Sequence, residues 1–451
     1  MNKRLGFLIL FSLCAIVAVL GGNFYLNTYA PFLNGNKAYD SADYETALDN
    51  YYQAAENNYA QAQYNLGHMI LNGYGTKQDP LIAFEWIEKA AKQGLPIACT
   101  GLGKLYLDGN GVIKDELQAI KYFRFASLKN EPEANYHLGR IYLNGLGVMP
   151  NNIQAFKWFK KSARTGNAAA QYQLGKMYRQ GRGTPIDIEA CMDWYTKAAE
   201  QGNTVAQNSL GLIYYKEGKY EPAHKWLLKS AKQGNANAQD LLGVMYAYGK
   251  GVDKNYKKAF KWFKKAALRN KADSQFNLGY LYYCGKGVAR NYPMALLWFR
   301  KAAAQKHIRS IQALGEMYYK GTGVSRNYKQ AMGYFQLAAY RKLPEAYHYL
   351  GLSYYYGHGV NKDYSISIQY FRKAAAAKNK YSQYALGKIY EKGNGVPVNL
   401  TKAYEWYTLA EKGGLAKAKK AKKEIASQMS VQEFKKAHDM AEKIYANQLD
   451  S

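Results

Sequence analysis

Apolar residues recur through most of this chain with the spacing of amphipathic helices that come in pairs. Between Ala134 and Tyr142 the apolar side chains fall on one helical face, and a glycine-rich turn follows. A second run then places Ala155 and Phe159 four residues apart on one face, with Trp158 beside them. The pattern therefore predicts a unit of two helices joined by a short turn.

The unit is copied along the chain at a fixed interval, marked by a glycine in the middle of each first helix. Eight of the nine gaps between these glycines are 36 residues, and one is 32. A period of this size indicates stacked repeats that contact mainly their neighbours. The marker glycines are Gly67, Gly103, Gly139, Gly175, Gly211, Gly243, Gly279, Gly315, Gly351 and Gly387.

A glycine inside a helix costs about 1 kcal/mol relative to alanine, so its recurrence needs a packing reason. We expect the two helices of a unit to approach closely at the marker, with a small alanine of the second helix facing it. The 32-residue gap arises at Lys216–Tyr220, where the fifth copy lacks four residues of the usual G-x-G loop. The other loops, such as Gly249–Gly251, lack the spacing of a phosphate-binding loop and are interpreted as structural.

The tryptophans all occupy one slot of the second helix, where the remaining copies carry tyrosine. An aromatic platform for sugars or bases is conceivable, but core packing is the interpretation that we favour. The seven are Trp86, Trp158, Trp194, Trp226, Trp262, Trp298 and Trp406.

Taken together, the copies read A-x-x-x-L-G-x-x-Y-x-x-G-x-G-V and then A-x-x-W-x-x-K-A-A-x-x-G. This pattern resembles the Sel-one-like repeat, a longer relative of the tetratricopeptide repeat. The resemblance implies an all-α, right-handed α-solenoid of about ten helix-turn-helix repeats over residues 60–414. A tetratricopeptide-like cap is expected at 31–59 and a polar helical cap at 415–451. The family further implies protein binding without catalysis.

The N-terminal segment, residues 1–30, lies outside the repeats. Lys3 and Arg4 precede an uncharged apolar run, Leu5–Leu20, as in a signal sequence or a signal anchor. The best cleavage site ends at Ala30 and is followed by Pro31, which favours retention as an anchor. The positive-inside rule then places the repeats outside the cytoplasm. We expect a protein anchored in a bacterial inner membrane with a periplasmic repeat domain, or a periplasmic or secreted one if the signal is cleaved.

The chain is strongly basic, with 62 Lys and Arg against 33 Asp and Glu, for a net charge of +29. Such a charge favours anionic partners. Much of it recurs on one stripe of the second helices, which we interpret either as a surface for an anionic envelope or as an ordinary solvated face. The stripe comprises Lys157, Lys160, Lys161, Lys261, Lys264, Lys265, Arg300, Lys301, Arg372 and Lys373.

The positions that vary between copies are the candidates for partner binding. In solenoids of this type the first helices line the concave side. Four residues after the marker, three consecutive copies carry tyrosine, which predicts a ladder of rings across repeats. Binding a partner and packing against the neighbouring repeat both remain open for these rings. The candidate residues are Tyr215, Tyr248, Tyr280, Tyr283, Tyr319, Tyr355 and Tyr356.

No residue pattern points to catalysis, to a metal or to a cofactor. The histidines have no partner at metal-ligand spacing. Cys99, Cys191 and Cys284 are more than two repeats apart, too far for a disulfide, and Cys14 lies in the apolar N-terminal run. The sequence therefore predicts a non-catalytic scaffold or adaptor of the bacterial envelope that binds a partner along its concave face. The alternatives are binding of peptidoglycan or lipopolysaccharide and a secreted host-interaction factor; nucleic acid is not an expected partner.

Overall fold

The computed structural model describes residues 24–449, and this part of the chain is built from helices without any strand. The first helices of the ten units each span thirteen residues. They are α4 (Ala60–Asn72), α6 (Pro96–Asp108), α8 (Pro132–Asn144), α10 (Ala168–Gln180), α12 (Thr204–Lys216), α14 (Ala236–Tyr248), α16 (Ala272–Cys284), α18 (Ile308–Lys320), α20 (Pro344–Tyr356) and α22 (Lys380–Lys392).

The second helices also span thirteen residues each. They are α5 (Pro80–Lys92), α7 (Glu116–Leu128), α9 (Asn152–Arg164), α11 (Ile188–Glu200), α13 (Tyr220–Lys232), α15 (Tyr256–Leu268), α17 (Tyr292–Ala304), α19 (Tyr328–Tyr340), α21 (Tyr364–Ala376) and α23 (Leu400–Lys412).

Shorter and longer helices flank the array at its two ends. These are η1 (Tyr25–Tyr29), α2 (Ala30–Asp40) and α3 (Tyr44–Glu56) before it, and α24 (Ala416–Ala426) and α25 (Val431–Leu449) after it.

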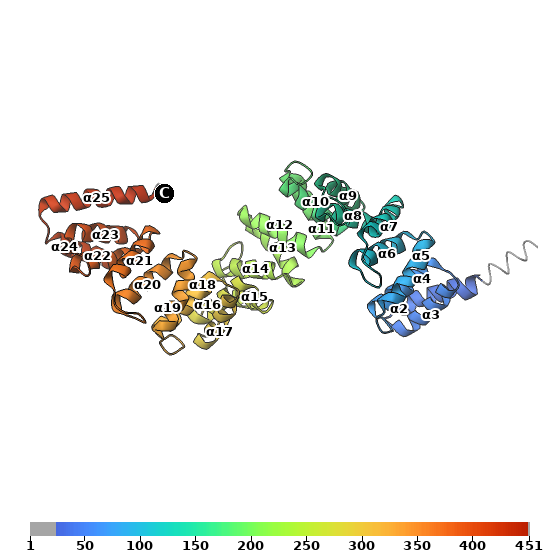
Figure 1. Ribbon diagram of the computed structural model, residues 1–451, viewed down its shortest axis with the longest axis horizontal. Coiled ribbons are helices and arrows are strands. Elements are labelled where there is room, and N and C mark those ends of the chain that lie inside the picture. The colour runs from blue at the N-terminus through green and yellow to red at the C-terminus, as the bar shows by residue number, and fades with distance from the viewer. Residues whose placement is uncertain (1–23, 450–451) are drawn as a thin grey trace, which may run out of the picture. The chain divides into compact units, whose positions relative to one another are not determined.

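The chain divides into two compact units, one ending at Leu210 and the other beginning at Gly211. Within each unit a first helix packs on its own second helix, which in turn packs on the next first helix (Figure 1). The buried residues accordingly form a series of small clusters that follow one another along the chain. This neighbour-to-neighbour packing is that of an α-solenoid, as the repeat period predicted.

Local side chains determine where the helices begin and end. Asn151 caps the start of α9, where its Oδ1 accepts a hydrogen bond from the Gln154 backbone N–H at 2.9 Å. Gly145 ends α8 in the left-handed conformation, with φ of 71°. Farther along the same kind of loop, Gly183 has φ of 72°, and a Cβ there would collide with the carbonyl oxygen of Asn152. The second glycine of a G-x-G loop therefore lets the loop rest on the second helix of the preceding repeat.

The marker glycine provides the close helix approach that we predicted, but against a different residue. A Cβ on Gly139 would lie 2.7 Å from the ring carbons of Phe159, which is fully buried. At Gly139 the aromatic ring is therefore the nearest neighbour in place of the expected Ala155, whereas at Gly67 and Gly279 the backbone of the alanine slot also approaches the marker, with Ala83 O at 3.0 Å and Ala295 O at 3.2 Å from the added Cβ. The missing Cβ is thus the space that an aromatic ring fills.

The predicted signal or anchor, residues 1–30, lies almost wholly outside the described residues. Its last part, from Phe24 onward, continues through η1 into α2, which has Pro31 in its first turn. Among residues 24–449 no helix combines the length and the apolar character needed to cross a bilayer.

Candidate partner-binding surface

The tyrosines four residues after the marker lie half-buried between their own helix pair. Tyr283 meets Tyr292, at the start of the following second helix, edge to face with ring centroids 5.4 Å apart. Tyr319 meets Tyr328 at 5.1 Å, and Tyr355 meets the next second helix in the same way. Within the described residues no ring contact joins these three tyrosines directly into the predicted ladder. Each meets the tyrosine that begins its own second helix, and Tyr319 also meets Tyr349 of the next repeat at 5.4 Å.

The loop of the next repeat covers these paired rings. Tyr319 Oη and His358 Nδ1 form a hydrogen bond of 2.8 Å, while the His358 ring stacks on Tyr328 at 4.1 Å. One repeat later, Asn394 Nδ2 donates to Tyr355 Oη at 2.6 Å. His358 and Asn394 are the middle residues of G-x-G loops. Through these contacts the tyrosines join neighbouring repeats. Of the two interpretations left open by the sequence, this is packing against the neighbouring repeat and not partner binding.

Tyr215 also packs in this way, against Tyr220 at 5.4 Å, across the shortened loop of the fifth copy. The three other candidates are exposed. Tyr248 is 72% exposed, Tyr280 45% and Tyr356 59%. Exposed tyrosine rings that keep a hydrogen-bonding tip are suited to partner contact. The structure thus separates the seven candidates into four joint residues and three surface residues.

A hollow of about 440 Å³ lies between the first helices α16, α18 and α20. We call it the α16–α20 hollow. Its aromatic wall includes the exposed Tyr280, and its charged residues are Arg309, Glu316 and Glu345. Gln312 forms part of the wall with 6% exposure, and its Oε1 has no hydrogen-bond partner among the described residues. Gln312 thus contributes a buried, unpaired acceptor to the wall of this hollow.

A second hollow, of about 370 Å³, lies between α20, α22 and α24 and is called the α20–α24 hollow. His348 lies in its wall, with Nδ1 2.8 Å from Ser382 Oγ. Burial, followed by the charge of Lys417, lowers the pKa of His348 to about 4, so the ring is neutral at pH 7. Lys388 and Lys417 are the two cations of this hollow.

The two hollows use the same positions of the repeat, 72 residues apart. Each hollow is lined by three positions of one repeat: three residues before, one after and four after its marker glycine. The next two helices of the same face complete the lining, α18 and α20 in one hollow and α22 and α24 in the other. A third hollow, of about 450 Å³ at α2, α3 and α4, also uses the first two of these positions, through Tyr64 and His68. Tyr280, Tyr283, Tyr355 and Tyr356 were predicted from the sequence, but the hollows themselves were not; the signal for them was the variation at the positions three before and one after each marker.

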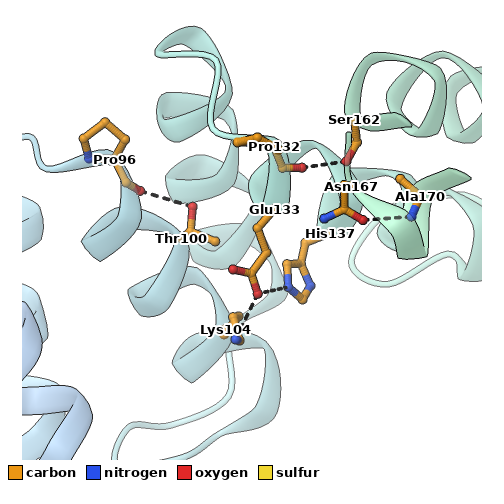
Figure 2. A network of polar contacts seen from close by, with 9 residues as sticks. All are labelled: Pro96, Thr100, Lys104, Pro132, Glu133, His137, Ser162, Asn167 and Ala170. Atoms are coloured by element: carbon orange, nitrogen blue, oxygen red, sulfur yellow. Dashed lines mark hydrogen bonds and ion pairs between the residues drawn. The ribbon is translucent and has the colours of Figure 1, made fainter. Parts of the chain in front are cut away.

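An ion-pair network lies on the first helices of the first unit, and its Lys104 occupies the position one after the marker Gly103 (Figure 2). The Glu133 carboxylate on α8 lies 3.2 Å from Lys104 Nζ on α6 and 3.6 Å from His137 Nε2. The contact with His137, followed by the charge of Lys104, lowers the pKa of the Glu133 carboxyl to about 2. Polar residues of consecutive first helices therefore reach one another across this face.

Most of the predicted basic stripe makes contacts within the protein. Lysines three residues after a tryptophan cover its ring, as Lys265 Nζ does at 4.8 Å from the centroid of Trp262. Arg300 and Arg372 donate to Tyr318 and Tyr390 of the next repeat. The same coverage is found for Trp86, Trp158, Trp194, Trp226 and Trp298.

The remaining cations of the stripe follow the same division. Lys161 bonds Ser127, Lys301 covers Trp298, Lys160 lies over Phe156, and Lys373 lies near Tyr370. By contrast, Lys157, Lys261 and Lys264 are exposed and have no hydrogen bond, ion pair or ring contact within the described residues. The stripe is thus partly structural and partly open to solvent.

The described residues include no group of three His, Cys, Asp or Glu side chains placed to hold a metal ion. Cys191 is fully buried in the alanine slot, as predicted, and Cys99 is buried as well. Burial raises the pKa of both thiols to about 11, which keeps them protonated at neutral pH.

Comparison with known proteins identifies the family. The model of the Sel1 repeat matches eleven segments, and the first covers the segment expected as a tetratricopeptide-like cap. The matched residues are 32–59, 60–95, 96–131, 132–167, 168–203, 204–235, 236–271, 272–307, 309–342, 344–379 and 380–415. The chain therefore belongs to the Sel1 repeat family, whose members are generally protein-interaction scaffolds and typically non-catalytic.

Two solved structures are informative. The chain is 32% identical to c5321, a protective antigen present in uropathogenic Escherichia coli strains; the match covers 88% of this chain and 86% of that one, with a TM-score of 0.77. It is 27% identical to a Sel1 repeat protein from Oxalobacter formigenes, over 69% of this chain and 93% of that one, with a TM-score of 0.50. No curated protein matches the chain.

Proposed function

We propose that this protein is a non-catalytic scaffold that binds a partner protein along the face of its first helices. The observation that carries the proposal is the recurrence of hollows at the same repeat positions, in both units of the chain. Tyr280 and Tyr356 line these hollows and are exposed at 45% and 59%. Interface hot spots are enriched in tyrosine, because it buries much area at a small entropic cost.

The proposed setting is the bacterial envelope, with the repeats outside the cytoplasm. Lys3 and Arg4 before the apolar run Leu5–Leu20 support an anchor or an export signal. The similarity to a protective antigen supports exposure of the repeats beyond the inner membrane. N-terminal sequencing of the mature protein from a membrane fraction tests this setting: an intact Met1 supports the anchor, whereas recovery from the cytosolic fraction contradicts export.

Site-specific photocrosslinking in the native envelope tests the partner-binding face. A benzophenone side chain at position 280 or 356 is expected to give discrete crosslinked products. The control position is Tyr340, which is 83% exposed on the second helix α19 and lies outside these hollows. Identical products from all three positions, or none from 280 and 356, would reject the first-helix face as the binding surface.

A second candidate function is binding of an anionic envelope polymer such as peptidoglycan or lipopolysaccharide. The net charge of +29 and the open side chains of Lys157, Lys261 and Lys264 favour it. Co-sedimentation with either polymer should weaken steeply as salt rises, because exposed charges are screened over about 10 Å at 0.1 M. Binding that persists in Lys261→Glu with Lys264→Glu and is insensitive to salt would contradict this candidate.

A further inference from the structure

The two hollows of the second unit have matching walls but different charges at two positions. One residue after the marker, the α16–α20 hollow has Glu316 where the α20–α24 hollow has Lys388. On the next helix, the first hollow has Glu345, six residues before Gly351, where the second hollow has Lys417, which lies 72 residues later on α24. Two carboxylates in one hollow are therefore replaced by two ammonium groups in the other.

The two lysines of the α20–α24 hollow lie over one aromatic ring. Lys417 Nζ is 4.3 Å and Lys388 Nζ is 5.7 Å from the centroid of Tyr384. Neither has a carboxylate within ion-pair distance among the described residues, and the buried His348 is neutral at pH 7. Two ammonium groups near one ring, neither with a carboxylate partner, favour an anion beside them.

The walls around these lysines are apolar and aromatic. Phe371 and Leu352 form the inner part, while Tyr356 and Tyr381 are 59% and 50% exposed at the mouth. Side chains of a partner could therefore bury apolar area beside an ion pair. Charge complementarity together with this wall fits a polypeptide with acidic side chains next to apolar ones.

The α16–α20 hollow argues against a uniformly anionic polymer as the occupant. Lys320 bonds Glu316 at 2.8 Å and Arg309 lines the rim, so this hollow has mixed charge, but Glu345 has no ion pair among the described residues. A polyanion that runs along the first helices would meet Glu345 and Glu316 two repeats before the lysines. A peptide can place its acidic residues at one end only.

We propose that the α20–α24 hollow binds side-chain carboxylates of an acidic, apolar-flanked segment of a partner protein. The carboxylates of the α16–α20 hollow disfavour the same residues there, so the charge difference fixes the direction in which the segment lies. This inference rests on the proposed function and specifies the chemistry of its partner.

Fluorescence anisotropy of the full chain with short labelled peptides tests the proposal. The probe is blocked at both ends and carries two glutamates among leucines and serines; its control has glutamine in place of glutamate. At physiological ionic strength, where the Debye length is about 8 Å, the acidic peptide is expected to bind at least about tenfold more tightly than its control. Equal binding of both peptides would overturn the proposal.

Paired substitutions locate the site. Lys388→Gln with Lys417→Gln should weaken binding of the acidic peptide by at least about tenfold. The matched control is Lys257→Gln with Lys329→Gln, which removes the same charge from exposed positions on α15 and α19, outside both hollows. If the two pairs weaken binding equally, net charge alone attracts the peptide and the proposal fails. Dextran sulfate serves as the competing anionic polymer. If it binds the full chain and displaces the peptide equally well from the two double variants, an anionic polymer is the better occupant and the proposal fails.

A gain of binding provides a second, independent measurement. Glu316→Lys with Glu345→Lys gives the α16–α20 hollow the cations of its counterpart, so two peptides should bind per chain in place of one. An unchanged stoichiometry would contradict the role assigned to these positions. Failure of all peptide binding, with crosslinking from positions 280 and 356 intact, would reject this inference and leave the proposed function standing.

Discussion

Gly315 and Gly333 lie in the two helices of one repeat, α18 and α19, but in opposite surroundings. A Cβ on Gly315 would lie 2.6 Å from Cε1 of Phe335, whose ring is fully buried, whereas a Cβ on Gly333 would meet nothing within 4 Å. The same substitution in the two helices therefore separates helix propensity from packing.

Gly315→Ala should destabilise the protein and Gly333→Ala should stabilise it. Overpacking against Phe335 costs about 1–3 kcal/mol, which exceeds the gain of up to about 1 kcal/mol in helix propensity. At position 333 nothing is overpacked, so only the gain in helix propensity remains. Thermal denaturation of both variants beside the parent checks the signs, and a shift of both in the same direction would contradict the argument.

His348 should make the second unit less stable in acid. Its pKa of about 4 in the folded chain lies below its ordinary value of 6.5, so the unfolded chain binds the proton more readily. The stabilisation is complete above pH 6.5 and is lost as the pH falls toward 4, by about 3 kcal/mol at most.

The measurement is the loss of Tm between pH 7 and pH 5, compared for the parent and for His348→Gln. Glutamine retains a polar group near Ser382 but does not titrate. The variant should therefore lose less stability over this interval. Equal losses would show that His348 does not titrate in this range.

At the scale of an element, the G-x-G loop and the start of a second helix form the joint between repeats. Asn394 Nδ2 donates to Tyr355 Oη at 2.6 Å, and the Tyr355 ring meets Tyr364 edge to face. Tyr355→Phe keeps the ring and removes the hydrogen bond, which should cost about 1 kcal/mol. Tyr248→Phe, at a residue that is 72% exposed, should leave the stability unchanged.

A double-mutant cycle between Tyr355→Phe and Asn394→Ala isolates this bond. Both partners contribute to one interaction, so the two losses should be less than additive by about 1 kcal/mol. Urea denaturation supplies the free energies. Additive losses would mean that the loop is held by its backbone alone.

The helix pairs were predictable from the sequence because their signals are local. The marker glycine and the loop glycines report backbone conformation and close approach within one repeat. The environment of Tyr319 was not predictable, because the ring is enclosed by Tyr328 nine residues later and by His358 in the next loop. How the loop folds back decides whether such a tyrosine faces a partner. The hollows were missed for the same reason, since each is lined by residues from several repeats.

At the scale of the whole molecule, neighbour contacts alone connect one part of an array to another. The C-terminal helices α24 and α25 cover the last repeat: Phe434 meets Tyr404 edge to face at 5.4 Å, and Ala437 is fully buried. Tyr404 is only 3% exposed beneath this cover. Without it, the last repeat would present an apolar face to water.

Removal of residues 415–451 should therefore loosen the neighbouring helices without affecting distant ones. Hydrogen exchange should accelerate in α22 and α23, while peptides from α8 and α9 in the first unit should keep their protection. This gradient follows from nearest-neighbour stability. A uniform loss of protection along the chain would instead indicate a single cooperative unit.

The loop glycine that rests on the preceding repeat, as Gly183 does on Asn152, has a consequence for the gene. The G-x-G loops make this joint through the same pair of repeat positions, whereas Gly218 of the shortened loop has no atom against it. Unequal crossing-over between two repeats that have G-x-G loops therefore yields a junction that is already complementary. Arrays of this kind are free to lengthen or shorten by whole repeats without a new interface to select. Under the proposed function, each such event would also change the separation of charged residues such as Glu316 and Lys388 and so the partner segment that fits the surface.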